Sequence, residues 1–332
     1  MSAPLARRIG PTGLIVALVS AATFGVSGPF AKALMEIGWT PGSTALARIG
    51  GSALVLAIPT ALLLRGRWRA VRQRWGTVVA YGLFGVAGTQ VLYFNALTHL
   101  PVGVALLLEY TSPLMVVLYL WARHRRVPGL LTAAGGVLTM IGLVVVLDLT
   151  GNLAFSPVGV LLALGAAVCN AVYFVMAADS SPELSPIAIT GLGMVVAALA
   201  VIGAIVVGLM PAGITLADTT MAGVAVAWWI PALGMVGIST VVAYVTGVFS
   251  ARRLGSAVAS FVAITEVIFA ALAAWWWAGE QLSLTQGFGA VLILLGIIGV
   301  KLGDARTAMP RPRRSVVDSD AVHVGSRPGR VR

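Results

Sequence analysis

The chain has few charged residues. Only 10% of its 332 residues are Asp, Glu, Lys or Arg, whereas 59% are apolar; soluble domains average roughly 25% and 45–50%. This composition excludes an ordinary soluble domain. The apolar runs are continuous, so they also lack the alternating segments of about ten residues that are typical of a membrane β-barrel. We therefore expect an all-α integral membrane protein.

Cysteine and histidine are equally scarce. The single cysteine, Cys169, stands inside an apolar run and cannot form an internal disulfide. The three histidines, His99, His124 and His323, fall in predicted loops or in the C-terminal tail. We expect no metal site and no cofactor.

Sequence motifs of enzymes are missing as well. The chain has no His-Glu-x-x-His and no Gly-x-Ser-x-Gly sequence, and no predicted span holds a histidine or two aspartates. It also has no nucleotide-binding motif. We expect no enzyme and no catalytic residues, and any transport would be driven by a gradient.

Ten apolar runs are present, each long enough to cross the membrane. A hydrocarbon core about 30 Å thick needs roughly 20 helical residues. The predicted spans are 12–36, 42–64, 76–98, 101–121, 128–148, 157–178, 186–209, 224–249, 255–278 and 283–303.

The basic residues predict the orientation of these spans. Of the 22 Lys and Arg residues, all but Lys32 and Arg48 fall on one side of the predicted spans. Cytoplasmic loops carry the excess of basic residues, so both termini are expected in the cytosol of a multi-pass cell-membrane protein. The net charge of +11 then indicates orientation rather than a nucleic-acid partner.

The ends of the chain differ from its apolar middle. We predict a short cytoplasmic N-terminus at 1–11 and a disordered basic cytoplasmic tail at 304–332, which has too little apolar content to pack. Two interpretations of the tail stay open: it lies on anionic membrane lipid, or it is simply solvated.

The sequence between these ends repeats itself. A shift of 154 residues superposes the pairs Trp121/Trp275, Gly135/Gly289 and Gly142/Gly296. A shift of 146 residues superposes Pro11 on Pro157 and Gly13 on Gly159. We predict a first repeat at 12–150 and a second at 151–303, each with five spans.

An odd number of spans per repeat makes the second copy enter the membrane from the opposite face. The expected fold is therefore ten transmembrane helices arranged as two inverted five-helix repeats. Inverted repeats are typical of transporters that work by alternating access, with the substrate bound between the halves near the bilayer midplane.

Three short runs resemble the EamA family of the drug/metabolite transporter superfamily. They are Glu109-Tyr110-Thr111-Ser112-Pro113-Leu114, then Thr265-Glu266-Val267, and Gly279-Glu280-Gln281-Leu282 continued by Gln286, Gly289, Leu292 and Gly296. The resemblance covers both repeats. Val267 departs from the family, where proline usually follows the glutamate, and this puts a helix kink there in doubt.

The resemblance also implies a function. The run Leu-Glu-Tyr-Thr-Ser-Pro is similar to the amino-acid exporter branch of the family, which includes threonine/homoserine exporters. A secondary active transporter that exports an amino acid or a related metabolite is the implied function. Substrate identity and direction of transport are not predicted by the residues themselves.

Two charged residues lie at similar depth in their predicted spans. At 1.5 Å per helical residue, Arg48 is roughly 11 Å and Glu109 about 12 Å from the same membrane face. In one interpretation they bind the carboxylate and the amino group of a zwitterionic substrate. In the other they form a structural ion pair between two helices.

Glu266 is the deepest carboxyl group, about 17 Å along its predicted helix from Gly255. A setting of low polarity favours the neutral form of a carboxyl group, as proton coupling requires. We consider Glu266 a proton-coupling candidate, with protons as the coupling ion; the alternative is a carboxyl group that is only a structural hydrogen-bond partner.

Uncharged polar side chains inside the spans complete the set of substrate-binding candidates. Interhelical amides often only join helices, at about 0.6 kcal/mol each, so each of them has a structural interpretation too. They are Gln90, Asn95, Tyr110, Asn170, Tyr173 and Tyr244.

Other kinds of membrane protein stay open at this point. A permease subunit would need a partner ATPase, and a receptor or scaffold would carry no flux. We expect a small-molecule substrate and contact with membrane lipid, and the sequence predicts no oligomeric state.

Overall fold

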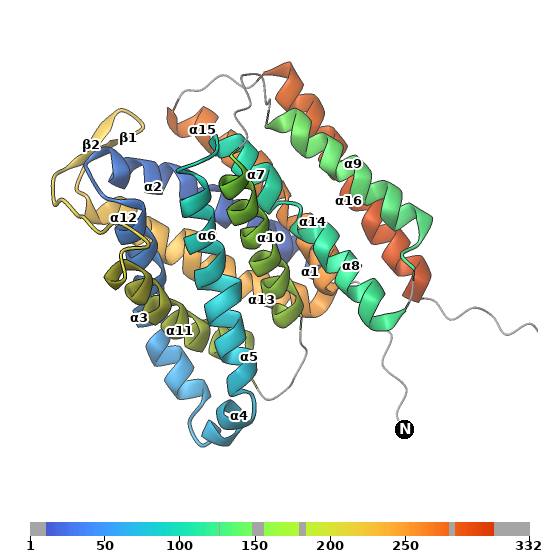
Figure 1. Ribbon diagram of the computed structural model, residues 1–332, viewed down its shortest axis with the longest axis horizontal. Coiled ribbons are helices and arrows are strands. Elements are labelled where there is room, and N and C mark those ends of the chain that lie inside the picture. The colour runs from blue at the N-terminus through green and yellow to red at the C-terminus, as the bar shows by residue number, and fades with distance from the viewer. Residues whose placement is uncertain (1–10, 126, 148–155, 179–183, 279–282, 309–332) are drawn as a thin grey trace, which may run out of the picture.

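Ten apolar helical segments form the bundle of the computed structural model, which describes residues 11–125, 127–147, 156–178, 184–278 and 283–308. In this part of the chain nine segments are long enough to span a membrane, and the tenth, Leu130–Val146, is shorter. The predicted all-helical membrane fold with ten helices is therefore confirmed (Figure 1).

The first five spans are built from a series of continuous and interrupted helices. They contain α1 (Pro11–Gly25), α2 (Ser27–Glu36), α3 (Pro41–Leu63), the short connecting helix α4 (Trp68–Gln73), α5 (Trp75–Ala80), the π-helix η1 (Tyr81–Gly88), α6 (Thr89–Ala96), α7 (Val102–Glu109), α8 (Ser112–His124) and α9 (Leu130–Val146).

The second five spans follow the same scheme and add a small hairpin. They contain α10 (Pro157–Ala177), α11 (Pro186–Val206), strands β1 (Thr219–Met221) and β2 (Val224–Val226), α12 (Trp229–Val236), the π-helix η2 (Gly237–Val242), α13 (Ala243–Leu254), α14 (Ser256–Ala263), α15 (Thr265–Ala278) and α16 (Leu284–Ala308).

Three spans begin with the same local signal, a hydroxyl residue followed by proline. The side chains of Thr40, Ser156 and Ser185 accept hydrogen bonds from the backbone N–H three residues later, at 3.4, 3.4 and 3.1 Å. A hydroxyl cap replaces a missing backbone partner, and proline at the first helical position has no N–H to satisfy. These residues therefore start α3, α10 and α11.

Two spans are interrupted at positions that the repeat relates. The fourth span breaks at Tyr110 and Thr111, and the ninth breaks at Ile264, 154 residues after Tyr110. The hydroxyls of Thr111 and Thr265 donate to the carbonyl three residues earlier, at 2.6 and 2.7 Å. Each break thus satisfies part of its own backbone, which a segment inside the bilayer must do.

The third and eighth spans contain the two π-helical segments, which the repeat also relates. A shift of 154 residues carries η1 onto residues 235–242, and η2 occupies Gly237–Val242. Short π segments inside α-helices are frequent at functional sites. Each repeat therefore departs from regular α-helix in its third and its fourth span.

The first span departs from this symmetry. It breaks at Val26 between α1 and α2, three residues before Pro29, because proline lacks the N–H of the next helical hydrogen bond. Its counterpart in the second repeat, α10, is uninterrupted from Pro157 to Ala177.

Helices of the two repeats pack in related pairs. α3 lies against α11, and α9 lies along α16 at one edge of the bundle (Figure 1). Similarly α1 packs against α13, while α10 packs against η1 and α6. Glycines permit the closest of these contacts: a side chain on Gly142 of α9 would meet the backbone nitrogen of Ile293 at 2.6 Å.

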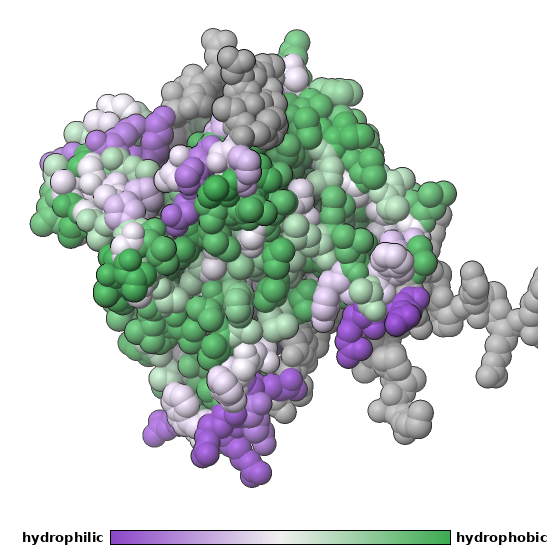
Figure 2. Space-filling view, viewed as in Figure 1, coloured by the Kyte–Doolittle hydropathy of each residue, from purple (hydrophilic) through white to green (hydrophobic). Residues whose placement is uncertain are grey.

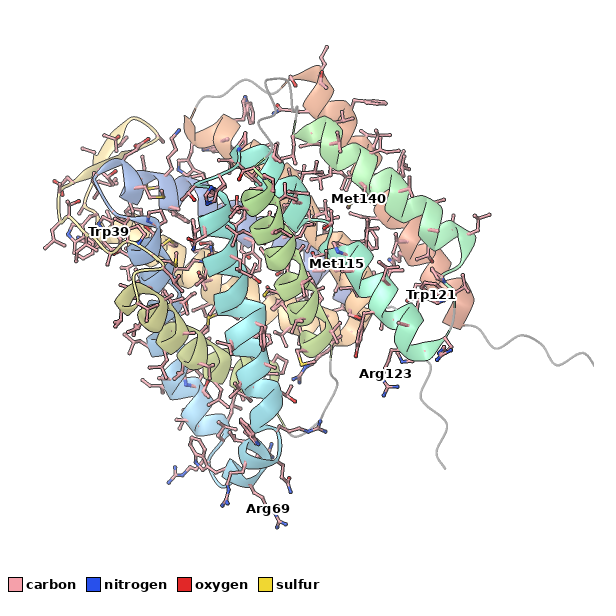
Figure 3. All side chains as sticks on the ribbon, viewed as in Figure 1. Trp39, Arg69, Met115, Trp121, Arg123 and Met140 are labelled. Atoms are coloured by element: carbon pink, nitrogen blue, oxygen red, sulfur yellow. The ribbon has the colours of Figure 1, made fainter. Side chains whose placement is uncertain are left out.

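The two ends of the bundle differ in charge. Arg69 on α4 and Arg123 on α8 lie at the same end (Figure 3), which we call the basic face. Hydrophilic residues lie at this face and also near the opposite end, and a wide apolar surface covers the middle of the bundle between them (Figure 2). Trp39 lies towards the other end, where the β1–β2 hairpin is found (Figures 1 and 3).

Residues 211–228, which we call the hairpin segment, are hydrogen-bonded to α2 and to the connection between α2 and α3. Trp39 Nε1 donates to the carbonyl of Thr215 at 2.7 Å, and the Thr219 hydroxyl donates to the carbonyl of Ala33 at 2.6 Å. The hairpin segment therefore holds the first two spans to the seventh and eighth at the end opposite the basic face.

Gly142 offers a test of the α9–α16 contact. We expect Gly142→Val to lower the stability of the protein by about 1–3 kcal/mol, as overpacking of a close contact does, because the new side chain would collide with the α16 backbone. Thermal unfolding in detergent and membrane abundance measure the effect. Gly203→Ala is the matched control, since no atom lies within 4 Å of its added Cβ; equal stability of the two variants would contradict the packing.

Candidate functional site

Three ionisable side chains meet in the interior of the bundle. Arg48 comes from α3, Glu109 from the end of α7 and Glu266 from the first turn of α15. Glu109 interacts electrostatically with Glu266 and Arg48, and Glu266 also interacts with Arg48. All three are half-buried and keep some accessible surface. We call them the charged cluster.

The interrupted spans position both carboxyl groups. Glu109 is the last residue of α7 before the break at Tyr110 and Thr111, and Glu266 follows the break at Ile264. Each break also begins a new half-helix, α8 or α15. The N-terminal end of a helix carries partial positive charge, and in transporters such ends point at anionic groups of the substrate.

Arg48 is held by the eighth span rather than by a carboxylate. Its Nε donates to the hydroxyl oxygen of Thr240 at 3.1 Å, and its guanidinium carbon lies 5.8 Å from the ring centroid of Phe24. Thr240 in turn donates to the carbonyl of Met235 at 2.8 Å. Among the described side chains, Arg48 and Glu109 form no direct ion pair, although their similar depth allows one.

This arrangement leaves the cation and the carboxyl groups with different partners. The Thr240 hydroxyl is the acceptor for Arg48 among the described residues, and the hydroxyl of Tyr110 is placed to donate to the carboxyl of Glu266. The terminal nitrogens of Arg48 are therefore available to a ligand carboxylate. The site can accept a molecule that carries both signs of charge.

Aromatic side chains surround the charged cluster. Tyr93 lies near both Glu109 and Glu266, and Tyr110 lies beside Glu266. The Phe24 ring, which lies beside Arg48, contacts the Tyr244 ring with centroids 4.9 Å apart. Aromatic faces exclude water and attract cations, so they strengthen charge interactions in the site.

The uncharged candidates from the sequence have different surroundings. Tyr110 and Tyr244 lie close to the charged cluster. Asn170 donates to the Ser112 hydroxyl at 3.2 Å, which is at the start of α8. Asn95 donates to the carbonyl of Val91 in its own helix at 2.8 Å.

The two remaining candidates differ in burial. Gln90 is half-buried on α6. Tyr173 is buried, and its ring contacts that of Tyr244, with centroids 5.5 Å apart. Tyr173 is thus connected to the charged cluster through Tyr244.

Four residues near the cluster are absent from the site candidates predicted from the sequence: Phe24, Tyr93, Ser112, which was noted only as part of the family-like run, and Thr240. Threonine and serine inside helices usually bond to their own backbone, so a hydroxyl that also serves another helix has no separate sequence signal. The aromatic residues are indistinguishable from ordinary membrane-helix packing. Only the three-dimensional contacts identify them.

Comparison with known proteins gives one family. The sequence profile of the EamA-like transporter family matches residues 11–148 and again 157–302. The threonine/homoserine exporter RhtA of Salmonella typhimurium strain SL1344 is 27% identical over 311 residues, 92% of this chain and 95% of the relative. The protein of the same name from Escherichia coli K12 is 26% identical over the same shares.

A solved crystal structure shares the fold. It superposes with a TM-score of 0.72 at 20% identity, covering 89% of this chain and 98% of that chain. At this identity the likeness concerns the fold alone.

Thr240 offers a test of the site geometry. Thr240→Val keeps the shape of the side chain but removes the acceptor for Arg48. We expect the apparent affinity for the transported substrate to fall about tenfold, since hydrogen bonds to charged groups contribute about 1.5–3 kcal/mol. Thr240→Ser keeps the hydroxyl and should behave like the native protein. Uptake kinetics in proteoliposomes measure both, and equal affinity of the two variants would show that Thr240 does not position Arg48.

Proposed function

The chain belongs to the EamA-like transporter family, and we propose that it is a secondary active exporter of an amino acid or a closely related zwitterionic metabolite. The observation that carries this proposal is the charged cluster. One guanidinium and two carboxyl groups lie within electrostatic reach of each other, among helices of both repeats.

The proposed substrate fits these groups by charge. Its carboxylate binds Arg48, helped by the partial positive charge at the start of α8 and α15. Its ammonium group binds Glu109, with aromatic faces nearby. A zwitterion therefore gains a partner for each charge at one position. Similarity to proteins named threonine/homoserine exporters supports this substrate class and the export direction.

The second carboxyl group supports coupling to protons. With one cation and two carboxyl groups, the empty site carries excess negative charge unless one carboxyl group binds a proton. An incoming ammonium group competes with that proton for the same negative charge. We assign the exchanging proton to Glu266, which begins a half-helix close to the middle of the ninth span.

Proton-driven transport can be tested with the purified protein alone. We expect proteoliposomes to accumulate an amino acid when a pH gradient is imposed, and a panel of amino acids and related metabolites identifies the substrate. Flux without any partner also separates a transporter from a permease subunit, a receptor or a scaffold. Absence of flux for the whole panel would overturn the proposed function.

Glu266→Gln tests the coupling group. Glutamine keeps the size and hydrogen bonding of the side chain but cannot release a proton. We therefore expect the variant to retain exchange of labelled for unlabelled substrate within about threefold, while uphill transport driven by the pH gradient falls to background, because only the second process needs the proton.

Glu36→Gln is the matched control for this experiment. Glu36 is exposed at the end of α2 and has no place in the proposed site, so both activities should stay native. A Glu266→Gln protein that still concentrates substrate would make the carboxyl group structural.

We also propose that the basic face is cytoplasmic, with both termini on that side of the cell membrane. The proposal rests on the concentration of arginine there, from Arg65 to Arg74 and at Arg123, Arg125, Arg252 and Arg253. A reporter fused after Arg74 should read cytoplasmic, and one fused after His99 should read external. The opposite result at both fusions would invert the orientation.

A further inference from the structure

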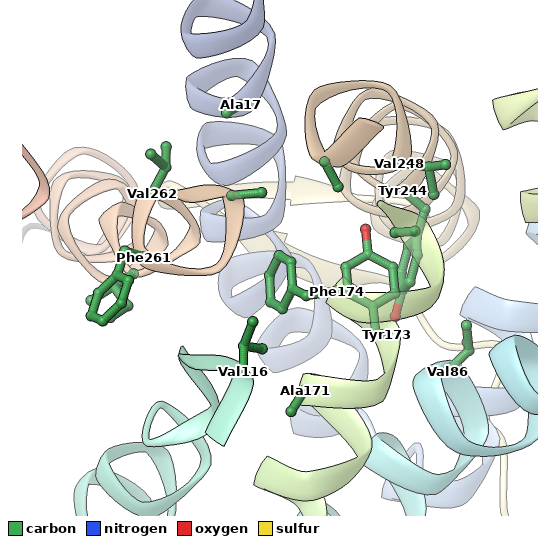
Figure 4. Close-up of a cluster of buried hydrophobic side chains, with 14 of the residues drawn as sticks. Ala17, Val86, Val116, Ala171, Tyr173, Phe174, Tyr244, Val248, Phe261 and Val262 are labelled. Carbon is green, nitrogen blue, oxygen red and sulfur yellow. The ribbon is translucent and has the colours of Figure 1, made fainter. Parts of the chain in front are cut away.

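Three buried tyrosines form a layer between the charged cluster and the basic face. Tyr81, Tyr173 and Tyr244 are 0%, 5% and 6% exposed. The centroid of the Tyr173 ring lies 5.6 Å from that of Tyr81 and 5.5 Å from that of Tyr244. We call these residues the tyrosine layer; Figure 4 shows Tyr173 and Tyr244 side by side within it.

The position of the layer follows from the helices that carry it. Tyr173 is four residues before the basic-face end of α10, and Tyr81 is six residues after the basic-face end of α5. Arg48 and Glu109 belong to the other halves of their spans, seven residues from Pro41 and from Val102. A solute in the charged cluster therefore has the tyrosine layer between itself and the basic face.

The layer also joins two separate packing units. Tyr81 and Tyr173 belong to the pair formed by the third and sixth spans, in which α10 packs against η1. Tyr244 belongs to the pair formed by the first and eighth spans, in which α1 packs against α13. The contact between Tyr173 and Tyr244 is thus a seam between units that the repeat relates to each other.

The Tyr173 hydroxyl is buried at this seam without a hydrogen-bond partner among the described residues. It points at Gly247 on α13, where an added Cβ would lie 2.5 Å from the hydroxyl oxygen and 3.0 Å from the Ser20 hydroxyl oxygen. Ser20 itself donates to the carbonyl of Ala243 at 2.7 Å. A buried polar group without a partner is unfavourable and calls for an explanation.

We propose that the tyrosine layer is the gate on the basic side of the transport site, closed in this structure, and that the Tyr173 hydroxyl assists its opening. When α10 separates from α13, water enters the seam and hydrates this hydroxyl. At this seam the closed state thus contains an unsatisfied hydroxyl, that of Tyr173, which the open state satisfies, and this makes opening easier. This inference rests on the proposed transport function, because only a transporter needs a gate beside its substrate site.

The repeat explains why a gate of this kind stands on one side only. The shift of 154 residues carries Tyr81 onto Met235 and Gln90 onto Tyr244. The shift of 146 residues carries Ser27 onto Tyr173. The counterparts Met235, Gln90 and Ser27 hold no aromatic ring, so the repeat does not carry the tyrosine layer into the other half of the membrane, where Met235 packs instead with Phe30 and Trp39.

Tyr173→Phe tests the role of the hydroxyl. The ring contacts persist, but the closed state loses the unsatisfied hydroxyl of Tyr173. We expect a higher melting temperature and a turnover number reduced by up to about tenfold, because the hydroxyl no longer favours the open state. Tyr119→Phe, on the exposed side of α8, is the matched control and should change neither. Unchanged turnover with Tyr173→Phe would overturn the proposed role of the hydroxyl.

Gly247→Ala tests the gate itself, with a readout that needs no substrate. The added methyl group would collide with the Tyr173 hydroxyl and prevent the seam from closing fully. Cys169, the chain's only cysteine, is buried one helical turn from Tyr173 on the site side of the layer. We expect its alkylation by a membrane-impermeant maleimide added on the basic side to become about tenfold faster than in the native protein.

The double variant Gly247→Ala with Tyr173→Phe supplies the control, since phenylalanine removes the hydroxyl with which the new methyl group collides. Its alkylation rate should return to the native value. Inverted vesicles and intact cells present opposite faces to the reagent, and an Arg69→Cys reporter in a Cys169→Ser protein identifies the basic one. A native rate in Gly247→Ala, or a fast rate that persists in the double variant, would overturn the gate, even if no transported substrate has been found.

Discussion

The bilayer requires each segment that crosses it to satisfy its own backbone hydrogen bonds, and the arrangement of this protein depends on where that requirement is relaxed. The chain departs from regular α-helix in its third, fourth, eighth and ninth spans at positions related by the repeat, and once more in the first span. The departures in the fourth and ninth spans lie beside Glu109 and Glu266. Irregular backbone is tolerated there because it is enclosed by other helices and lines the candidate site.

Much of this architecture is predictable from the sequence because membrane helices leave a strong signal. The ten apolar runs predict the spans, and the 154-residue shift that aligns Trp121 with Trp275 also aligns the breaks at Tyr110 and Ile264. The interruption at Val26 can be explained from the sequence by one residue, Pro29. The π segments have no such signal, since they use the same apolar and small residues as the α-helices around them.

The candidate site is only partly predictable, because counting along a helix gives the depth of a side chain but not its direction. Arg48 and Glu109 each lie seven residues after the first residue of their helices, yet the hydrogen bond of Arg48 goes to Thr240 on another span. Asn95, at a plausible depth, bonds within its own helix. The proposed roles of Glu266 and of the other candidates are matters for experiment, since burial and proximity show where a group lies rather than what it does.

The hairpin segment has a consequence for how the protein is made. Trp39 and Thr215 are separated by 176 residues, so their hydrogen bond cannot form until the seventh span has emerged from the ribosome and entered the bilayer. Until then the connection between α2 and α3 lacks its hydrogen bond to the hairpin segment, and the N-terminal spans are held only by local contacts. Contacts between residues so far apart in the sequence form slowly, because closing the long loop costs conformational entropy before the contact is made. The contacts that hold the first two spans to the hairpin segment therefore form only after seven of the ten spans have been made.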